Sequence, residues 1–176
     1  MLCFYEKKWY TNGVNMLKQS VRIMKGIMMK STKVNIKKLK ENAKIPTYGS
    51  EFAAGADLYA CLEEEVTIKP GETYLVKTGI ALEIPEGFAG LIYARSGLAT
   101  KKGLAPANKV GVVDADYRGE IMVALHNHSQ QDAIVEPGER IAQMVITPFL
   151  AAKFVAVEEL EETVRGENGF GSTGRK

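Results

Sequence analysis

The stretch VTIKPGETYLVKTGIALEIPEGFAGLIYA, residues 66–94, decides the fold class. Along it, β-branched and aromatic residues alternate with polar ones, a period that places side chains on opposite faces of an extended chain. Pro70-Gly71 and the turn Pro85-Glu86-Gly87 interrupt the alternation at strand length. The stretch therefore predicts consecutive β-strands joined by short turns.

The same pattern continues toward the C-terminus in EIMVALHNHS (120–129), RIAQMVITPF (140–149) and KFVAVEEL (153–160). One short helix is expected after Arg95, where Ser96 could cap GLATKKG before Gly103 ends it. Regularly spaced strands without long amphipathic helices predict an all-β protein, a β-sandwich or jelly roll.

Length and composition limit the remaining possibilities. A chain of 176 residues, 45% hydrophobic and 25% charged, is typical of one globular domain. No run reaches the roughly 20 apolar residues that a membrane span needs. The two cysteines, Cys3 and Cys61, do not form a CxxC pair. This argues against a disulfide scaffold or a zinc site and favours a reducing compartment.

The net charge of +2 conceals an uneven distribution. Residues 1–40 contain ten Lys/Arg and one acid, a net +9, whereas the remainder contains 13 bases and 20 acids, a net −7. A basic arm could bind nucleic acid or serve as an address signal. It lacks the apolar core of a secretory signal and the arginine bias of a transit peptide. We interpret residues 1–29 as a basic extension outside the core.

Two segments carry charge where a plain sandwich does not require it. FAAGADLYA (52–60) places Asp57 in an apolar run, and a buried carboxylate is costly without a partner. ARSGLATKKG (94–103) places Arg95 and Ser96 at the expected helix start, where backbone N–H groups favour an anion. Arginine adds planar, bidentate charge suited to phosphate. A capped helix beside a surface arginine is the alternative interpretation.

NKVGVVDADYRGEI (108–121) is richer in polar groups. Asn108 offers both a donor and an acceptor, as recognition of a nucleobase edge requires, and Gly111 permits close backbone approach. Asp114 and Asp116 share a face if the chain is extended and diverge if it turns. Asp-Ala-Asp-Tyr-Arg-Gly is also ordinary turn material, so a simple hairpin is equally compatible with the local sequence.

Three further features carry polar side chains. EPGERIAQMV (136–145) places Gln143 inside an apolar strand. RGENGFGSTGRK (165–176) combines four glycines with Phe170, whose ring could stack on a base, but it lacks the P-loop pattern. His126 and His128 share one face of a strand and could begin a metal site, yet no third ligand is obvious. We interpret the two histidines as structural.

Five segments, in this order and spacing, resemble the five motifs of the trimeric dUTP diphosphatases (dUTPases). They are AGADLYA (54–60), RSGLA (95–99), NKVGVVDADYRGE (108–120), PGERIAQMV (137–145) and RGENGFGSTG (165–174). The resemblance implies a jelly-roll-like β-sandwich, the dUTPase-like β-clip, assembled as a homotrimer whose active sites are shared between subunits. It also implies a division into an extension (1–29), a β domain (30–160) and a flexible C-terminal arm (161–176) that closes over the active site.

The implied reaction is hydrolysis of dUTP to dUMP and pyrophosphate, by attack of water on the α-phosphate. Such a reaction limits uracil in DNA and supplies dUMP for dTTP synthesis. By this resemblance Asp114 activates the water, and Mg²⁺ is held by substrate phosphates and waters without direct protein ligands. No membrane or nucleic-acid partner is implied, and the expected location is the cytoplasm.

The remaining roles are carried over from the same motifs. Phosphates would be bound by Arg95, Ser96, Gly97 and Gln143. The uracil edge would be recognised by Asn108, the backbone of Gly111, Val112, Val113 and Asp114, and nearby Met122. Tyr117 would pack beneath the sugar and exclude UTP, while Asp57 would support Arg95. The arm would close through Arg165, Phe170, Gly171, Ser172 and Thr173.

Two other functions are alternatives to hydrolysis of dUTP. A dCTP deaminase shares this fold, but the deaminases resemble DAGFxGxITLE, and the position of their catalytic glutamate is Ala124 here. The deaminases also lack the GFGSTG lid. A non-catalytic trimeric binding protein is supported only by the basic extension, and the motifs show no loss of Asp114 or Phe170. Hydrolysis of dUTP is the function that the sequence favours.

Overall fold

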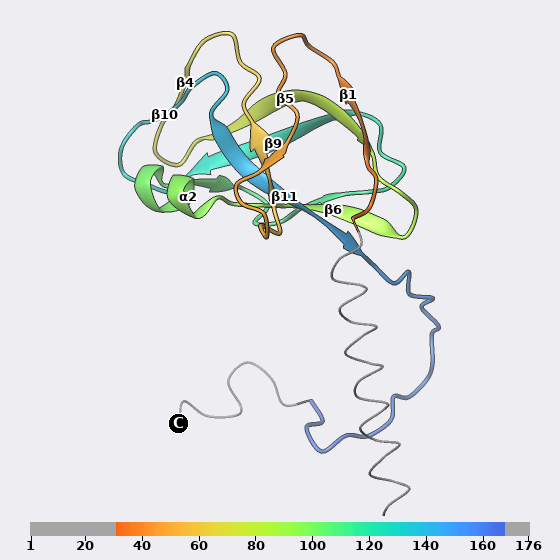
Figure 1. Cartoon of the computed structure of the whole chain (residues 1–176). Helices are drawn as coiled ribbons and strands as arrows, with labels where there is room; N and C mark the ends of the chain where they lie inside the picture. Colours follow the sequence, from red (N-terminus) through yellow and green to blue (C-terminus); the bar gives the residue numbers. More distant parts are fainter. Residues whose placement is uncertain (1–30, 168–176) are drawn as a thin grey trace, which may run out of the picture.

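Strands dominate the computed structural model, which describes residues 31–167 (Figure 1). The described residues form the following strands and one helix: β1 (Asn35–Lys38), β2 (Thr47–Tyr48), β3 (Ala56–Tyr59), β4 (Val66–Ile68), β5 (Thr73–Glu83), β6 (Phe88–Tyr93), α2 (Ser96–Lys102), β7 (Leu104–Pro106), β8 (Gly111–Val113), β9 (Glu120–Asn127), β10 (Ala133–Val135) and β11 (Arg140–Pro148). The predicted all-β fold is confirmed.

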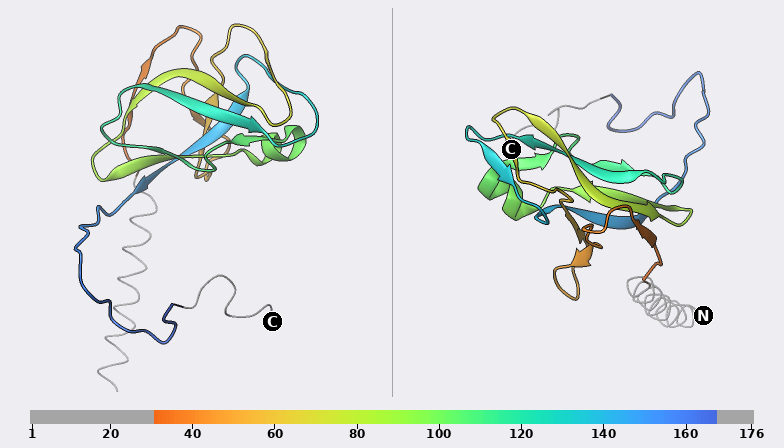
Figure 2. Two further views of the ribbon diagram at one scale, coloured as in Figure 1. Left: turned by 180° about the vertical axis from the view of Figure 1, so that it is seen from behind. Right: turned by 90° about the horizontal axis from the view of Figure 1, so that it is seen from above.

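The strands form two facing layers and a small side ribbon, visible from behind and from above in Figure 2. One layer has the order β1-β5-β9-β7, the other has the order β2-β3-β11-β6-β8, and β10-β4 form the ribbon. The strand pairs are antiparallel throughout. Because sequence neighbours often lie in different sheets, the connections cross between layers, as in a jelly-roll-like sandwich.

The core lies between the layers. Strand β9 alternates regularly, with Ile121, Val123 and Leu125 buried and Met122 and Ala124 on the opposite, partly exposed face. Leu58 of β3 and Ile141 of β11 are fully buried in the facing sheet. Burial of such side chains contributes about 1.5–3 kcal/mol each, which holds the two sheets together.

The helix α2 is where it was predicted, but its cap is different. Arg95, not Ser96, is the N-cap residue, with extended backbone angles and no side-chain capping hydrogen bond. Its carbonyl accepts the first helical bond from Ala99 N at 2.9 Å, which makes Ser96 the first helical residue. Gly103 ends the helix in the left-handed conformation (φ 66°), as glycine does most readily.

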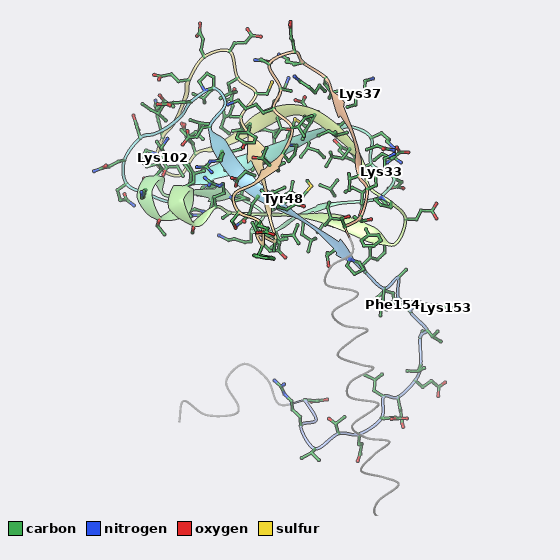
Figure 3. All side chains as sticks on the ribbon, in the orientation of Figure 1. Lys33, Lys37, Tyr48, Lys102, Lys153 and Phe154 are labelled. Atoms are coloured by element: carbon green, nitrogen blue, oxygen red, sulfur yellow. The ribbon has the colours of Figure 1, made fainter. Side chains whose placement is uncertain are left out.

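The expected strand at 153–160 is wrong: no strand is assigned after Pro148 within the described part of the chain. Beyond β11 the chain runs away from the body, and Phe154, labelled in Figure 3, is 94% exposed. An alternating sequence forms a strand only where a neighbouring strand can accept its hydrogen bonds. We call residues 149–167 the outer segment.

Candidate active site

Asp57 is the centre of a charged cluster. Its side chain is 9% exposed, and both of its oxygens accept hydrogen bonds from arginine: Oδ1 from Arg95 Nε at 2.7 Å and Oδ2 from Arg140 Nη1 at 3.2 Å. Arg95 Nη1 also reaches the carbonyl oxygen of Arg140 at 3.4 Å. The predicted pairing of Asp57 with Arg95 is therefore confirmed, and two guanidinium groups hold one carboxylate in place.

Gln143 lies beside this cluster because of strand register. On β11 it is paired with Asp57 of β3 on one side and with Tyr93 of β6 on the other. Its Nε2 donates to Ala94 O at 2.9 Å, and a Cβ added at Gly55 would lie 2.6 Å from its Oε1. The amide nitrogen of Gln143 is thus occupied, and its Oε1 lies toward Gly55. A larger residue at position 55 would displace this oxygen.

Ser96 and Gly97 open helix α2 directly after Arg95, and both are exposed. The first N–H groups of a helix have no partner within it. A Cβ added at Gly97 would meet nothing within 4 Å, so the space around this turn is open. The structure therefore groups Asp57 of β3, Gln143 of β11, and Arg95 with the start of α2 at one site.

Strand β8 carries Gly111, Val112 and Val113 at the edge of the five-stranded sheet. Its inner edge is paired with β6, with Gly111 opposite Ile92, whereas no described strand pairs with its outer edge. Asn108, which is exposed, precedes it: a Cβ added at Gly111 would lie 3.3 Å from Asn108 Nδ2. An amide side chain and an unpaired strand edge thus lie together, one strand away from the charged cluster.

The aspartates fall in a turn, but the turn does not make a simple hairpin, because β8 pairs with β6 in one sheet and β9 pairs with β5 and β7 in the other. Tyr117 N donates to Asp114 O at 3.2 Å, which closes the turn after β8 and leaves Asp114 and Asp116 exposed. Tyr117 folds back over the turn, and its hydroxyl donates to Glu120 O at 3.1 Å. A Cβ added at Gly119 would overlap the Tyr117 hydroxyl, so glycine is needed for this ring position.

The other predicted residues are placed as follows. Met122 lies on the partly exposed face of β9, paired with Lys77 of β5. Arg165 lies exposed on the outer segment. Phe170, Gly171, Ser172 and Thr173 lie outside the described residues. The structure therefore places the predicted site residues up to Arg165, and the roles of the four residues at 170–173 stay predictions.

Sequence reasoning missed four side chains that hold this region together. Arg140 shares Asp57 with Arg95, and Glu120 accepts a hydrogen bond from the backbone of Gly79 at 2.8 Å. Lys102 of α2 binds Glu139 Oε1 at 2.7 Å, which ties the helix to the turn before Arg140. The PGER sequence signals a turn followed by an arginine, but no local pattern indicates which carboxylate it binds.

The two histidines form a contact of their own. Their ring centroids are 4.5 Å apart at 63°, and His126 Nδ1 lies 2.8 Å from Thr73 Oγ1. The described residues contain no group of three or more His, Cys, Asp or Glu that could hold a metal ion. Nor does any described helix have the length and hydrophobicity to cross a membrane.

These features together are typical of a known class of nucleotide hydrolases. They are an all-β sandwich, an aspartate bound by arginine, a glutamine paired with this aspartate on the neighbouring strand, and an edge strand that follows an exposed asparagine. The model of the dUTPase family matches residues 41–174, and this chain belongs to that family. A deoxyuridine 5'-triphosphate nucleotidohydrolase of Syntrophotalea carbinolica is 50% identical over 146 residues, which cover 83% of this chain and 99% of that protein. Its counterpart in Hydrogenobaculum sp. is 51% identical over 144 residues, covering 82% and 99%.

Solved structures agree with this assignment. A variant of the Staphylococcus bacteriophage 80alpha dUTPase with dUpNHpp has a TM-score of 0.74 and 31% identity, covering 82% of this chain and 99% of that one. A variant of the phage phi11 dUTPase, described with a structural Mg(II) ion, has a TM-score of 0.66 and 27% identity, covering 74% and 100%. These similarities favour neither the deaminase nor the non-catalytic alternative.

Proposed function

We propose that this chain hydrolyses dUTP to dUMP and pyrophosphate by attack of water on the α-phosphate. Membership of the dUTPase family supports the substrate and the reaction. The observation that carries the proposal is the Asp57–Arg95 pair, with Gln143 beside it in strand register. A guanidinium held by one carboxylate is oriented before the triphosphate arrives, which lowers the entropic cost of binding it.

Asp114 is the general base of the proposed reaction. It follows β8 directly, its backbone carbonyl is bound by Tyr117 N, and its side chain is exposed to solvent. A carboxylate fixed at its backbone and open at its side chain can accept the proton of an attacking water. Water then adds to the α-phosphorus, the bond to the bridging oxygen breaks, and pyrophosphate leaves.

Mg²⁺ completes the proposed site as an ion bound to the substrate. The chemistry of the side chains fits a hydrated ion: Asp57 already binds two arginines, and Gln143 Oε1 is a neutral oxygen suited to a metal-bound water. Mg²⁺ normally retains several waters and binds substrate phosphates. Bound in this way, it would neutralise charge on the phosphate oxygens.

Phosphate binding is assigned to Arg95, Ser96 and Gly97 at the start of α2, together with Gln143. Arg95 supplies the bidentate charge, and the first helical N–H groups supply neutral donors. These groups surround an open turn, which leaves room for a phosphate chain. The outer segment adds Arg165, and we propose that Phe170, Gly171, Ser172 and Thr173 close over the bound nucleotide.

Uracil recognition is assigned to Asn108, the backbone of Gly111, Val112, Val113 and Asp114, and Met122. The free outer edge of β8 supports this assignment, because it presents N–H and C=O groups at fixed spacing to a base edge. Cytosine exchanges a donor for an acceptor and would leave such groups unpaired. Tyr117 lies beyond the same edge strand, where we propose that it packs beneath the deoxyribose and excludes a 2′-hydroxyl.

A homotrimer with shared active sites is part of the proposal. The outer segment supports it: Leu150, Phe154 and Leu160 are 96%, 94% and 86% exposed in the single chain. Large apolar side chains exposed along one segment in this way favour a protein–protein contact. We propose that residues 161–176 act as the arm crossing to a neighbouring subunit, that residues 30–160 form the β domain, and that residues 1–29 lie outside it.

We place the proposed enzyme in the cytoplasm. Cys61 supports this location, since it is a free, buried thiol that donates to Asn42 Oδ1 at 3.1 Å. Such an arrangement is typical of a reducing compartment.

The direct test is pyrophosphate release from a panel of dUTP, dCTP, UTP and dTTP, with and without Mg²⁺. We expect efficient hydrolysis of dUTP alone, dependent on Mg²⁺, and a loss of about 10²–10⁴-fold in Asp114→Asn, because the amide cannot accept the proton. Wild-type turnover of dUTP no faster than that of the variant would sink the proposal. Efficient cleavage of UTP would contradict the role of Tyr117.

A further inference from the structure

Strand β5 is irregular where it passes the start of β9. Its register against β9 shifts between Lys77 and Ala81, and Gly79 within the shift has a φ of +68°. A Cβ added at Gly79 would lie 2.7 Å from both Ala43 Cβ and Cys61 Sγ. The bulge is therefore a tightly packed position that only glycine fits.

The hydrogen bonds of this bulge are completed by groups outside the regular ladder. Gly79 N donates to Glu120 Oε1 at 2.8 Å, and Gly79 O accepts from Leu39 N at 2.7 Å. Thr78 Oγ1 donates to Ile121 O at 2.5 Å. The carboxylate of Glu120 thus accepts the hydrogen bond that the shifted ladder does not provide for Gly79 N, and it adds a side-chain link to the backbone pairing of Glu120 with Ala81.

The same residue holds Tyr117 from its other end. The hydroxyl of Tyr117 donates to the backbone carbonyl of Glu120 at 3.1 Å, and the ring folds closely over Gly119. The side chain of Glu120 is therefore fixed on the core side by Gly79, while its carbonyl fixes the tip of Tyr117. A shift of Glu120 would move the tyrosine ring, because the Tyr117 hydroxyl is bound to the Glu120 carbonyl and the ring packs on the adjoining Gly119.

We propose that Glu120 is a positioning residue that sets the discrimination between dUTP and UTP. This inference rests on the proposed function, in which Tyr117 occupies the space that a ribose 2′-hydroxyl would need. The side chain of Glu120 does not touch the nucleotide in this scheme. It anchors the start of β9 to the β5 bulge, and this anchor keeps the Tyr117 ring close to the sugar.

A matched pair of variants separates the effect of the length of the Glu120 side chain from the effect of its charge. Glu120→Gln keeps the length and the Oε1 acceptor but removes the charge, whereas Glu120→Asp keeps the charge but is one methylene too short to reach Gly79 N. We expect Glu120→Asp to lower the ratio of kcat/KM for dUTP to kcat/KM for UTP by about tenfold, mainly through faster UTP cleavage. Glu120→Gln should keep this ratio within about twofold of the wild-type value.

A second measurement tests the hydrogen bond between Gly79 N and Glu120 Oε1 without any nucleotide. Burial raises the pKa of the Cys61 thiol, and its sulfur packs against Gly79. In a Cys3→Ser background Cys61 is the only thiol, so its labelling by a disulfide reagent reports opening of the bulge. We expect labelling about 3–10-fold faster in Glu120→Asp than in Glu120→Gln, because opening exposes the thiol.

The outcomes are distinct. A folded Glu120→Asp protein with an unchanged dUTP/UTP ratio overturns the proposal, and so does a Glu120→Gln protein that loses as much discrimination as Glu120→Asp. A general structural role would lower both activities equally and leave their ratio constant. Failure of the proposed function would appear as absent dUTP hydrolysis in the wild-type chain, while the labelling experiment would still decide whether the anchor exists.

Discussion

The charged cluster of the body and the outer segment differ in how much of their structure one chain provides. In the cluster, Asp57 binds Arg95 and Arg140, and each of these side chains comes from a different part of the sequence. In the outer segment, which runs away from the body, Phe154 (labelled in Figure 3) and Leu160 are almost fully exposed. The body therefore holds Arg95, the proposed phosphate-binding group, in a fixed orientation, whereas the outer segment leaves its apolar side chains exposed in the single chain.

This difference matches the two tasks of a nucleotide hydrolase. Groups that stabilise charge act best when they are fixed before the reaction, because reorganisation then costs little. Groups that admit substrate and release product must move, and they draw on the least stable parts of the fold. Variants of the charged cluster should therefore have larger effects than truncation of the arm, and a contact that supports the cluster from helix α2 should have the smallest.

Loss of Asp57 should have the largest effect. We expect Asp57→Ala to lower kcat/KM for dUTP by about 10²–10³-fold, because Arg95 loses the carboxylate that orients it. Stability should fall by about 1–3 kcal/mol, less than for a fully buried pair, since the Arg95 and Arg140 side chains are 25% and 51% exposed. Steady-state kinetics and thermal unfolding measure the two quantities.

The matched controls for Asp57→Ala are Asp57→Asn and Asp132→Asn. Asp57→Asn keeps the shape and one acceptor, so we expect an intermediate loss. Asp132 is exposed in the turn before β10 and should tolerate the change. Equal activity of Asp57→Ala and Asp132→Asn would show that the cluster does not prepare Arg95 for phosphate.

Truncation of the arm should slow the reaction without unfolding the body. We expect a chain that ends at Val164 to lose about 10²-fold in kcat while its thermal midpoint changes little, because this segment adds closure and not core. Phe170→Ala should give a smaller loss with the same midpoint. Kinetics with dUTP and calorimetry on the same samples provide the test, and an unfolded truncation product would contradict the assigned role.

Only part of the charged cluster could be predicted from the sequence. The apolar run around Asp57 indicated that this carboxylate needs a partner, and the resemblance to the dUTPase motifs suggested Arg95, which lies 38 residues further along the chain. The contact with Arg140 was not predictable, because it depends on the register of β11 against β3, and that register shifts between Arg140 and Ala142. Local patterns contain no information on a shift that the packing of both sheets determines.

Two other differences have physical causes of the same kind. Residues 153–160 alternate as a strand does, yet no strand is assigned there, because the segment runs away from the body (Figure 1) and pairs with none of the described strands. Glu120 bonds to Gly79, 41 residues away, only because β5 bulges beside it. Periodicity predicts the elements, whereas contacts at bulges and at chain crossings follow from their assembly.

The smallest effect concerns Lys102, labelled in Figure 3, which supports the cluster from helix α2. Its Nζ donates to Glu139 Oε1 at 2.7 Å and to Ile134 O at 2.8 Å, so it holds the helix against the turn before Arg140. We expect Lys102→Met to raise KM for dUTP about 3–5-fold with kcat nearly unchanged, because the helix start and Arg140 would no longer be held together.

The adjacent residue provides the control for this last variant. Lys101→Met removes the same charge from the same turn of α2, but Lys101 is exposed, so we expect KM to stay within about twofold of wild type. The Lys102–Glu139 pair is partly exposed, at 35% and 21%, and should contribute no more than about 1 kcal/mol. An equal rise in KM for both variants would assign the effect to lost positive charge near the triphosphate, and not to the position of the helix.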